Sequence, residues 1–433
     1  MSAATSVRPP AFRLCGAASH TYAEHLARLG PLPAVDAAGL VALAEASGLA
    51  GRGGAGFPTG RKIAAVAAGG RGVVVANGAE GEPASRKDRL LLQSAPHLVL
   101  DGLVTAARAL GGSTAHLYGA PDLLDGPVAA ALAERSDPVA LHLVPAPDTF
   151  VAGQETAVVA AVRGGRPVPT DPSPPVRERG VDGRPTLVLN VETLAHLAQV
   201  VRFGPAWFRT FGTPDEPGTR LATVSGSVVR PGVYEVAGGA PLAEVVEAAG
   251  GFAEPTGALL VGGYHGGWVP TSALAGLAWS RAALAPWGAA PGAGVVVALP
   301  AQRCGLEATA TIATHLAGES AQQCGPCLNG LPALAAELRT LAEARANRAS
   351  LHCLQQLTGL VEGRGACAHP DGTVRMVRSA LRTFARDVDA HLDGRCLAAR
   401  PTDQGRSGQG RSGQGRSDQG RSDQGRPDQG RRR

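Results

Sequence analysis

Short runs of β-branched and apolar residues alternate with helical patterns through the first half of the chain, and this alternation constrains the fold most. The runs have the length of buried strands, and the segments between them carry leucine at helical spacing. Such an alternation favours an α/β fold with a mostly parallel sheet. The predicted strands are 73–77, 116–118, 140–144 and 186–190, and the predicted helices are 34–50, 61–68, 88–111, about 127–135 and 191–203.

A different pattern begins after the Pro-rich segment 213–218. Two strands flank the turn sequence Arg230-Pro231-Gly232, and Pro241 opens an amphipathic helix that ends at Ala249. With a strand over 258–262, these elements predict a small α+β module of the β-grasp kind. From about residue 301 the pattern is helical and predicts a bundle. Its expected helices are 306–317, 328–345, 350–361 and 373–392.

The 433 residues are 44% apolar, which supports folded cores and excludes a wholly disordered chain. The last 33 residues repeat units such as DQGRS and hold 8 Arg, so most of the formal net charge of +5 belongs to them. We expect a flexible tail there, with RNA contact as the alternative, and no nucleic-acid partner for the folded part. The expected divisions are an α/β domain (1–218), a β-grasp module (219–300), a helical domain (301–395) and a tail (396–433).

Seven cysteines are too few for a disulfide scaffold, and six of them lie in the last third of the chain. This clustering favours a reducing compartment and a metal or cluster site. The N-terminus has no apolar run typical of a signal peptide, and no stretch approaches the length of a membrane span. We therefore expect a cytoplasmic protein without a direct membrane span.

Two polar, Gly-bearing loops hold the two lysines of the chain, Lys62 and Lys87. The first, GRGGAGFPTGRK (51–62), contains G-x-G-x-x-G but follows a predicted helix, so it fails the test for an ordinary dinucleotide fold. Closely spaced glycines still let backbone N–H groups approach a phosphate or a flat ring. The second, NGAEGEPASRKDR (77–89), follows a predicted strand, where α/β sheets bind ligands, although a solvated charged loop is the alternative.

These loops belong to a longer series of motifs. GQETAV (153–158), LNVETL (189–194), CGPCLNG (324–330) and GACAHPDG (365–372) follow them in order. The series resembles the flavin-bearing, NADH-oxidising subunit of respiratory complex I, the 51 kDa or F-type subunit, a family shared with NAD-linked hydrogenases and formate dehydrogenases. The resemblance covers about residues 45–392 and implies an FMN- and NADH-binding domain, an SLBB domain and a helical domain with one [4Fe-4S] cluster.

The resemblance also assigns roles to residues of this chain. Gly51, Gly53, Gly54 and Gly56 would cradle FMN, and Asn77 and Asn190 would hold its polar edges. Lys62 and Thr193 would lie near its phosphate. Glu80 and Glu155 would face the nicotinamide and its ribose as the catalytic groups, and Phe57 would stack on the adenine. Lys87 receives no specific role.

Several positions depart from the family pattern. Ala79 replaces an acidic residue, Gln154 replaces a glutamate and Leu189 replaces an asparagine. At the expected counterparts of two adenine-clamping aromatics the chain has Ala65 and Val176. These changes affect nicotinamide binding more than flavin binding, since lost base stacking costs roughly 1–3 kcal/mol in comparable sites.

The cluster motif is also incomplete. Cys324, Cys327 and the distant Cys367 correspond to ligands, whereas Ala321 stands where the family has the first cysteine. The fourth ligand could come from Ser320, Gln322, Gln323 or Cys353. A zinc site that includes His369, or no metal, are the alternatives. We expect Cys304, Cys353 and Cys396 to be ordinary core or surface thiols, and His196 and His265 to have no catalytic role.

The expected function is an FMN-dependent NADH dehydrogenase-type subunit of the quinone-linked complex I kind. It would pass electrons from NADH through FMN to an iron–sulfur cluster. The implied partner is a ferredoxin-like or thioredoxin-like [2Fe-2S] protein, within a larger oxidoreductase complex. One alternative is a flavoprotein that uses another donor, such as ferredoxin. The other is a non-catalytic scaffold with a degenerate cluster site.

Overall fold

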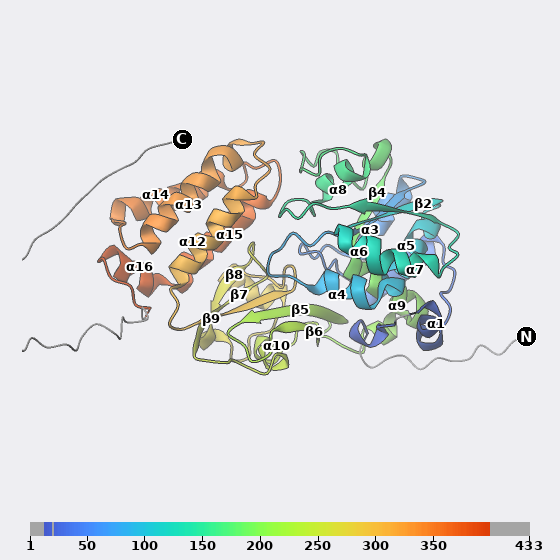
Figure 1. Ribbon diagram of the computed structural model, residues 1–433, viewed down its shortest axis with the longest axis horizontal. Coiled ribbons are helices and arrows are strands. Elements are labelled where there is room, and N and C mark those ends of the chain that lie inside the picture. Colours follow the sequence, from blue (N-terminus) through green and yellow to red (C-terminus); the bar gives the residue numbers. More distant parts are fainter. Residues whose placement is uncertain (1–12, 20, 399–433) are drawn as a thin grey trace, which may run out of the picture. The chain divides into compact units, whose positions relative to one another are not determined.

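The computed structural model describes residues 13–19 and 21–398, which fall in one compact unit that ends at Ala398. The expected flexible tail therefore lies almost wholly outside the described residues. The first part of the unit contains α1 (Tyr22–Leu29), α2 (Ala37–Ser47), α3 (Thr59–Ala68), β1 (Val73–Gly78), α4 (Lys87–Ser94), α5 (Pro96–Ala109), β2 (Thr114–Gly119), α6 (Pro121–Leu123), α7 (Ala129–Ala133), β3 (Ala140–Pro145), α8 (Glu155–Val162), β4 (Thr186–Asn190) and α9 (Val191–Phe208) (Figure 1).

The first sheet is parallel throughout, as the alternation predicts, and the structure shows its strand order to be β3-β2-β1-β4. The single helix expected over 88–111 is wrong: α4 and α5 are separate and bent by 95°. The break falls at Ala95, which has extended φ of −140°, because the ring of Pro96 disfavours helical geometry in the residue before it. This corner lets α5 lie against the sheet.

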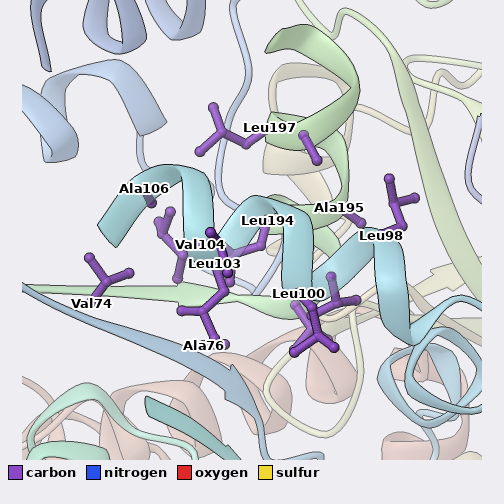
Figure 2. Close-up of a cluster of buried hydrophobic side chains, with 14 of the residues drawn as sticks. Val74, Ala76, Leu98, Leu100, Leu103, Val104, Ala106, Leu194, Ala195 and Leu197 are labelled. Carbon is purple, nitrogen blue, oxygen red and sulfur yellow. The ribbon is translucent and has the colours of Figure 1, made fainter. Parts of the chain in front are cut away.

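The core of this part lies where α5 and α9 pack against each other and against β1 (Figure 2). Leu103 and Leu194 are fully buried there. A Cβ on Gly102 would lie 2.1 Å from the carbonyl oxygen of Leu194, so glycine is what allows α5 and α9 to approach this closely. The packing fixes the start of α9, and that start forms part of the candidate site.

The second sheet has the order β6-β5-β9-β7-β8, with β5 and β9 parallel and the other pairs antiparallel. The hairpin and helix match the sequence prediction, but β8 and β9 complete the sheet and were not predicted as members of it. Its strands are β5 (Thr219–Gly226), β6 (Gly232–Ala237), β7 (Thr256–Val261), β8 (Gly267–Pro270) and β9 (Val295–Pro300), with α10 (Leu242–Ala248) and α11 (Arg281–Leu284) beside them.

The helices that follow are coloured orange to red in Figure 1 and share an apolar core of leucine, alanine and valine. The expected helix over 373–392 is two helices, because Phe384 leaves helical geometry with φ −105° and ψ 32°. The helices are α12 (Gly305–Gly318), α13 (Leu331–Ala342), α14 (Arg348–Val361), α15 (His369–Thr383) and α16 (Ala385–Leu392). The domain boundaries given above stay a prediction, with each sheet and the helices falling inside the expected ranges.

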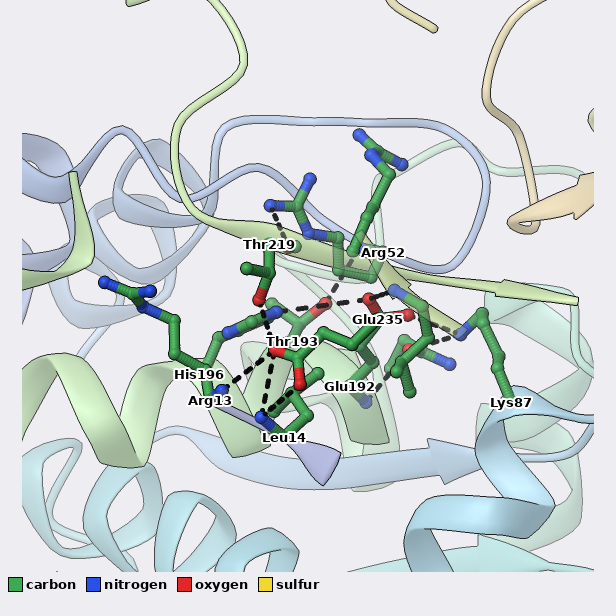
Figure 3. Close-up of polar contacts among 12 residues, drawn as sticks. Arg13, Leu14, Arg52, Lys87, Glu192, Thr193, His196, Thr219 and Glu235 are labelled. Atoms are coloured by element: carbon green, nitrogen blue, oxygen red, sulfur yellow. Dashed lines mark hydrogen bonds and ion pairs between the residues drawn. The ribbon is translucent and has the colours of Figure 1, made fainter. Parts of the chain in front are cut away.

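A layer of polar contacts joins α9 and the segment around Leu14 to the second sheet (Figure 3). Glu192 of α9 accepts a hydrogen bond from the backbone N–H of Leu221 at 2.9 Å. Glu235 of β6 accepts hydrogen bonds from the backbone of Leu14 at 3.0 Å and from the hydroxyl of Thr219 at 2.6 Å. Because polar groups shielded from water need hydrogen-bond partners, these contacts favour one position of the second sheet against α9.

Among the described helices, none by itself has the length and apolar character needed to cross a membrane. The bent pair α4 and α5 meets the length and composition criteria together, and nearly all of α5 is buried against other elements of the chain.

Candidate functional site

All the residues that the sequence assigns to FMN and NADH line one cavity of about 850 Å³. This volume is in the range of small-molecule sites in proteins. Its walls come from the loops around the first sheet, from residues 262–293 beside the second sheet, and from the start of α15. The predicted residues on the walls are Gly51, Gly53, Gly54, Gly56, Phe57, Lys62, Asn77, Glu80, Glu155, Asn190 and Thr193.

The Gly-rich loop connects α2 to α3 and needs its glycines for two reasons. Gly54 and Gly56 have φ of +112° and +64°, which other residues rarely adopt. A Cβ on Gly53 would lie 3.3 Å from the Cβ of Asn190, so the loop rests directly on the residue that caps α9. The N-terminus of α9 therefore faces the cavity beside the loop, an arrangement that favours anions.

Arg52, within the same loop, points away from the cavity. It is buried, and its guanidinium donates to the carbonyl oxygens of Pro217 and Thr219 at 3.2 and 3.1 Å. Burial, reinforced by nearby Arg220, lowers the pKa of Arg52 to about 9. Its backbone N–H donates to Thr193 Oγ1 at 2.9 Å. Arg52 thus anchors the loop, a role that could not be predicted because the G-x-G-x-x-G pattern specifies no residue type at this position.

Both lysines reach this cavity but in different surroundings. Lys62 is partly exposed and lies 2.6 Å from Glu155 and 2.7 Å from the carbonyl oxygen of Val188. Lys87 is buried, with its ammonium 2.6 Å from Asp88 and 3.0 Å from Glu192. Burial acts to lower the pKa of Lys87, but these two carboxylates outweigh it and raise the pKa above its ordinary value. Lys87 is therefore a permanent buried cation below the cavity wall.

The side chains of the two candidate asparagines are used to hold the loops that form the walls. Asn77 Nδ2 donates to the carbonyl oxygen of Gly153 at 2.8 Å. Asn190 Nδ2 donates to Asp88 at 2.7 Å, and its Oδ1 accepts from Lys87 at 3.1 Å. Asn190 also caps α9 by accepting from the backbone N–H of Glu192. Both amides are thus fixed in orientation by the protein.

Glu80 accepts from the backbone N–H groups of Asp88 and Arg89, both at 3.1 Å, and from the Ser85 hydroxyl at 2.5 Å. Its carboxylate therefore lies at the start of α4, where a negative charge is favourable. Glu80 thus lines the cavity and organises the second polar loop at the same time.

Glu82 is a cavity residue of the second polar loop to which the sequence assigned no role. Its carboxylate accepts from the backbone N–H of Tyr264 at 2.8 Å. A Cβ on Gly263 would lie 2.4 Å from Glu82 Oε2, so glycine makes room for this contact. Burial raises the pKa of Glu82 to about 7. A carboxyl with that pKa in a cavity can exchange protons near neutral pH.

The structure also places Gln154, Phe57 and the two residues that stand where adenine-clamping aromatics were expected. Gln154 caps α8, because its Oε1 accepts from the backbone N–H of Thr156 at 2.8 Å. Phe57 is 47% exposed at the cavity, available for stacking. Neither Ala65 nor Val176 lines the cavity, and Val176 is buried in an apolar cluster. The inference from these two residues about lost adenine stacking therefore has no support in the cavity geometry.

Aromatic rings connect the cavity to the segment that holds Cys367. The ring of Phe150 lies 4.6 Å from that of His265 and 5.4 Å from that of His369, between ring centroids. His265 lies in a loop, as expected, but it is half-buried and lines the cavity, whereas we expected it to have no role. His196 is as expected: it is fully buried against Phe208, and burial holds its pKa well below the ordinary value.

The three predicted cluster ligands gather beside this ring group. Cys324 Sγ lies 3.6 Å from Cys327 Sγ. Burial raises the pKa of the Cys327 thiol to about 11, and it also raises that of Cys367; the charge of Cys324 adds to both. For Cys324, burial is outweighed by backbone N–H groups, including that of Ala366, so its pKa is lowered. The charge of one thiol thus affects the pKa of the other two, which indicates that the three thiols lie close together. We call the group of Cys324, Cys327 and Cys367 the C-x₂-C site.

The C-x₂-C site offers three thiols to an iron–sulfur cluster, and two of them, Cys324 and Cys327, lie at a spacing that a single tetrahedral ion also allows. Among the described residues, no group drawn from Cys324, Cys327, Cys367 and His369 brings three ligand atoms within 4.8 Å of one another. Four iron atoms bind four separate ligands, so the sulfurs can lie farther apart than around zinc. The hydroxyl of Ser320 is buried without a hydrogen-bond partner in the described part of the chain, and it remains a candidate fourth ligand. Cys353 is exposed on α14.

The residues around the main cavity likewise fit FMN. A glycine cradle, the N-terminus of α9 and a cation within the wall suit a phosphate, and fixed amides and apolar surface suit a flat ring. Arg281, which no sequence motif marks, closes the rim by donating to the carbonyl oxygen of Ala55 at 2.6 Å.

Three family models match successive parts of the chain. They are the Nuo51 FMN-binding domain over residues 44–199, the SLBB domain over 221–263, and the NADH-ubiquinone oxidoreductase-F iron-sulfur binding region over 307–391. The protein is thus of the class that combines a flavin-binding domain with an iron–sulfur-binding region.

Relatives of known name narrow this class. The chain is 31% identical over 381 residues to the second NADH-quinone oxidoreductase F-type subunit of Rhizobium meliloti (strain 1021), covering 82% of this chain and 89% of that protein. It is 29% identical over 386 residues to the corresponding F-type subunit of Streptomyces coelicolor (strain ATCC BAA-471 / A3(2) / M145), covering 82% and 83%. The chain belongs to the family of F-type subunits of NADH-quinone oxidoreductase.

Solved structures agree with this fold. Two crystal structures of an NAD+-reducing [NiFe]-hydrogenase, in the H2-reduced and air-oxidized states, match with TM-scores of 0.75 and 0.77 at 30% and 32% identity. The matches cover 85% and 82% of this chain but 64% and 63% of the hydrogenase chains. The chain thus spans just under two thirds of the length of those structures.

Proposed function

We propose that this chain oxidises NADH at a bound FMN and delivers the electrons singly to an iron–sulfur cluster in its helical region. The observation that carries the proposal is the one cavity whose walls hold the Gly-rich loop, both lysines and both candidate catalytic glutamates. FMN, when bound, supplies hydride acceptance and single-electron release. The family membership and the names of the relatives support the same function.

The residues of this chain bind and orient. The N–H groups of the Gly-rich loop and the start of α9 would receive the flavin phosphate, with Lys62 and Thr193 near it. Asn77 and Asn190 would present fixed polar edges to the ring. Glu80 and Glu155 would face the nicotinamide and its ribose, and Phe57 would offer its exposed ring to the adenine. Positioning of this kind is the main contribution of a protein to hydride transfer.

Glu82 handles the accompanying proton in this scheme. Its buried carboxyl has a pKa of about 7, so both protonation states are populated near neutral pH. A proton held at a Glu82 carboxyl oxygen can be given to, or taken from, a group in the cavity.

We further propose a ferredoxin-like or thioredoxin-like [2Fe-2S] protein as the acceptor, inside a larger cytoplasmic oxidoreductase complex that ends on quinone. The relatives named NADH-quinone oxidoreductase support quinone, and the hydrogenase structures show that chains of this fold also occur in other assemblies.

Anaerobic purification followed by absorbance and EPR spectroscopy tests the proposal. Flavin absorbance that bleaches on addition of NADH, with a reduced cluster signal, is the expected result. Flavin that stays oxidised with NADH contradicts NADH oxidation and supports the alternative donor, which Ala79 and Gln154 favour because they replace acidic residues of the family pattern. Protein without flavin or iron contradicts both redox functions and supports the scaffold that the missing cysteine at Ala321 suggests.

A further inference from the structure

A second group of possible metal ligands lies in the helical region, separate from the C-x₂-C site. It consists of Cys304, His391 and Cys396, whose ligand atoms all lie within 4.8 Å of one another. In the part of the chain that the structure describes, no other set of three His, Cys, Asp or Glu side chains comes this close. From the sequence both cysteines were expected to be ordinary thiols, because they are 92 positions apart and belong to no motif.

Two glycines allow the chain to assemble this group. Helix α16 ends in a Schellman turn: Gly394 has φ +73°, and the N–H of Arg395 donates back to the carbonyl oxygen of Ala390 at 2.9 Å. The turn reverses the chain, so Cys396 returns toward His391. At the start of α12, a Cβ on Gly305 would lie 2.4 Å from the ring of Phe384, so glycine lets α12 approach the corner between α15 and α16.

The histidine is held in the tautomer that a metal ligand needs. His391 Nδ1 lies 2.9 Å from the carbonyl oxygen of Leu341 in α13. A carbonyl oxygen accepts only, so the proton is on Nδ1 and the lone pair is on Nε2. That nitrogen lies 3.6 Å from Cys304 Sγ. A hydrogen bond from the far ring nitrogen to a backbone carbonyl is the usual support of a metal-binding histidine.

The cysteines complete a suitable donor set. Cys304 is buried and immediately precedes the first turn of α12. Burial raises the pKa of its thiol to about 11, so a metal ion has to displace the thiol proton when it binds there. Cys396 is exposed, so the group is open on one side. Two thiolates and one imidazole are typical zinc ligands, and three protein ligands leave a fourth tetrahedral position for solvent.

We propose that Cys304, His391 and Cys396 bind one zinc ion that ties the end of α16 to the start of α12. Binding forms two Zn–S bonds and one Zn–N bond and releases the two thiol protons to solvent, with no change of oxidation state. The ion joins three helices, because the Leu341 carbonyl of α13 orients the histidine. This proposal does not depend on the proposed redox function.

The test uses the full chain, purified anaerobically and titrated with Zn²⁺ against a chromogenic chelator, with zinc and iron measured per chain. Cys396→Ser removes one ligand at an exposed position, and Cys15→Ser is the matched control, an exposed cysteine to which no metal role is assigned. We expect about one tightly bound zinc in the wild type and the control, and affinity weaker by about tenfold or more in Cys396→Ser, with equal iron in all three.

Co²⁺ provides a second measurement. Thiolate-to-metal absorption should appear in the wild type, should weaken in Cys396→Ser and should shift in His391→Gln. Zinc should also raise the unfolding temperature of the wild type and not that of Cys396→Ser. Equal zinc affinity in Cys396→Ser and the wild type overturns the proposal, as does a disulfide between Cys304 and Cys396 in the anaerobic protein.

Discussion

Replacement of Lys87 by methionine should destabilise the protein far more than the same replacement at Lys62. Lys87 is 2% exposed and neutralises Asp88 and Glu192, which are themselves buried. Methionine fills similar volume but leaves those carboxylates unpaired, and loss of one member of a buried ion pair costs about 3–5 kcal/mol. The side chains of Lys62 and Glu155 are 20% and 38% exposed, so that pair contributes about 0–1 kcal/mol.

Urea unfolding at about pH 7, followed by circular dichroism, measures the difference as a shift of the first transition midpoint. A double variant, Lys87→Met with Glu192→Gln, should recover part of the loss, because it removes one of the uncompensated charges. If Lys87→Met and Lys62→Met unfold at the same urea concentration, the reasoning about the buried cation is refuted.

Three further predictions concern the flavin cavity, the cluster and the acid stability. Gly56→Ala should weaken FMN binding roughly tenfold in a fluorescence titration, because the residue has φ +64° and a Cβ would lie 2.7 Å from Arg281; Gly70→Ala, with φ +93° and nothing within 4 Å, is the control that should bind normally. Ala321→Cys should raise the iron content per chain and slow its loss to a chelator; unchanged iron would mean that the C-x₂-C site does not bind a cluster. Burial acts to raise the pKa of Asp101, but a hydrogen bond from His25 and two guanidinium groups hold it below its ordinary value, so this carboxylate stabilises the fold above about pH 4 and the contribution is lost as pH falls toward the folded-state pKa. The stability deficit of Asp101→Asn, about 3–5 kcal/mol at neutral pH, should therefore shrink in acid unfolding curves, and a constant deficit would contradict this.

The alternation of strands and helices was sufficient to predict the parallel sheet, because buried strands of a parallel sheet are short continuous apolar runs. Helix ends were predicted less well. The break at Ala95 depends on the proline that follows it, whereas the break at Phe384 has no proline or glycine to mark it. The strand β9 was visible as an apolar run, but nothing local indicated that it pairs with β5 in parallel.

For the candidate site, residues within motifs were predicted and residues that meet across elements were not. The glycines, Lys62 and Asn190 were found because the motif series carries them. Arg281 reaches the same cavity from a segment whose sequence shows no pattern, and Glu82 lies inside a motif that assigned it no role. Arg52, also within a motif, anchors the Gly-rich loop from the side opposite the cavity.

The sequence by itself determined the class of fold, the family and the residue types at the cavity, since these depend on local periodicity and on short motifs. Only the tertiary structure decided the different environments of the two lysines and the meeting of Cys304 with His391 and Cys396. The physical reason is that burial and ligand geometry arise from contacts between residues far apart in the chain. A lysine becomes a buried cation, and a cysteine a candidate ligand, through what packs around it.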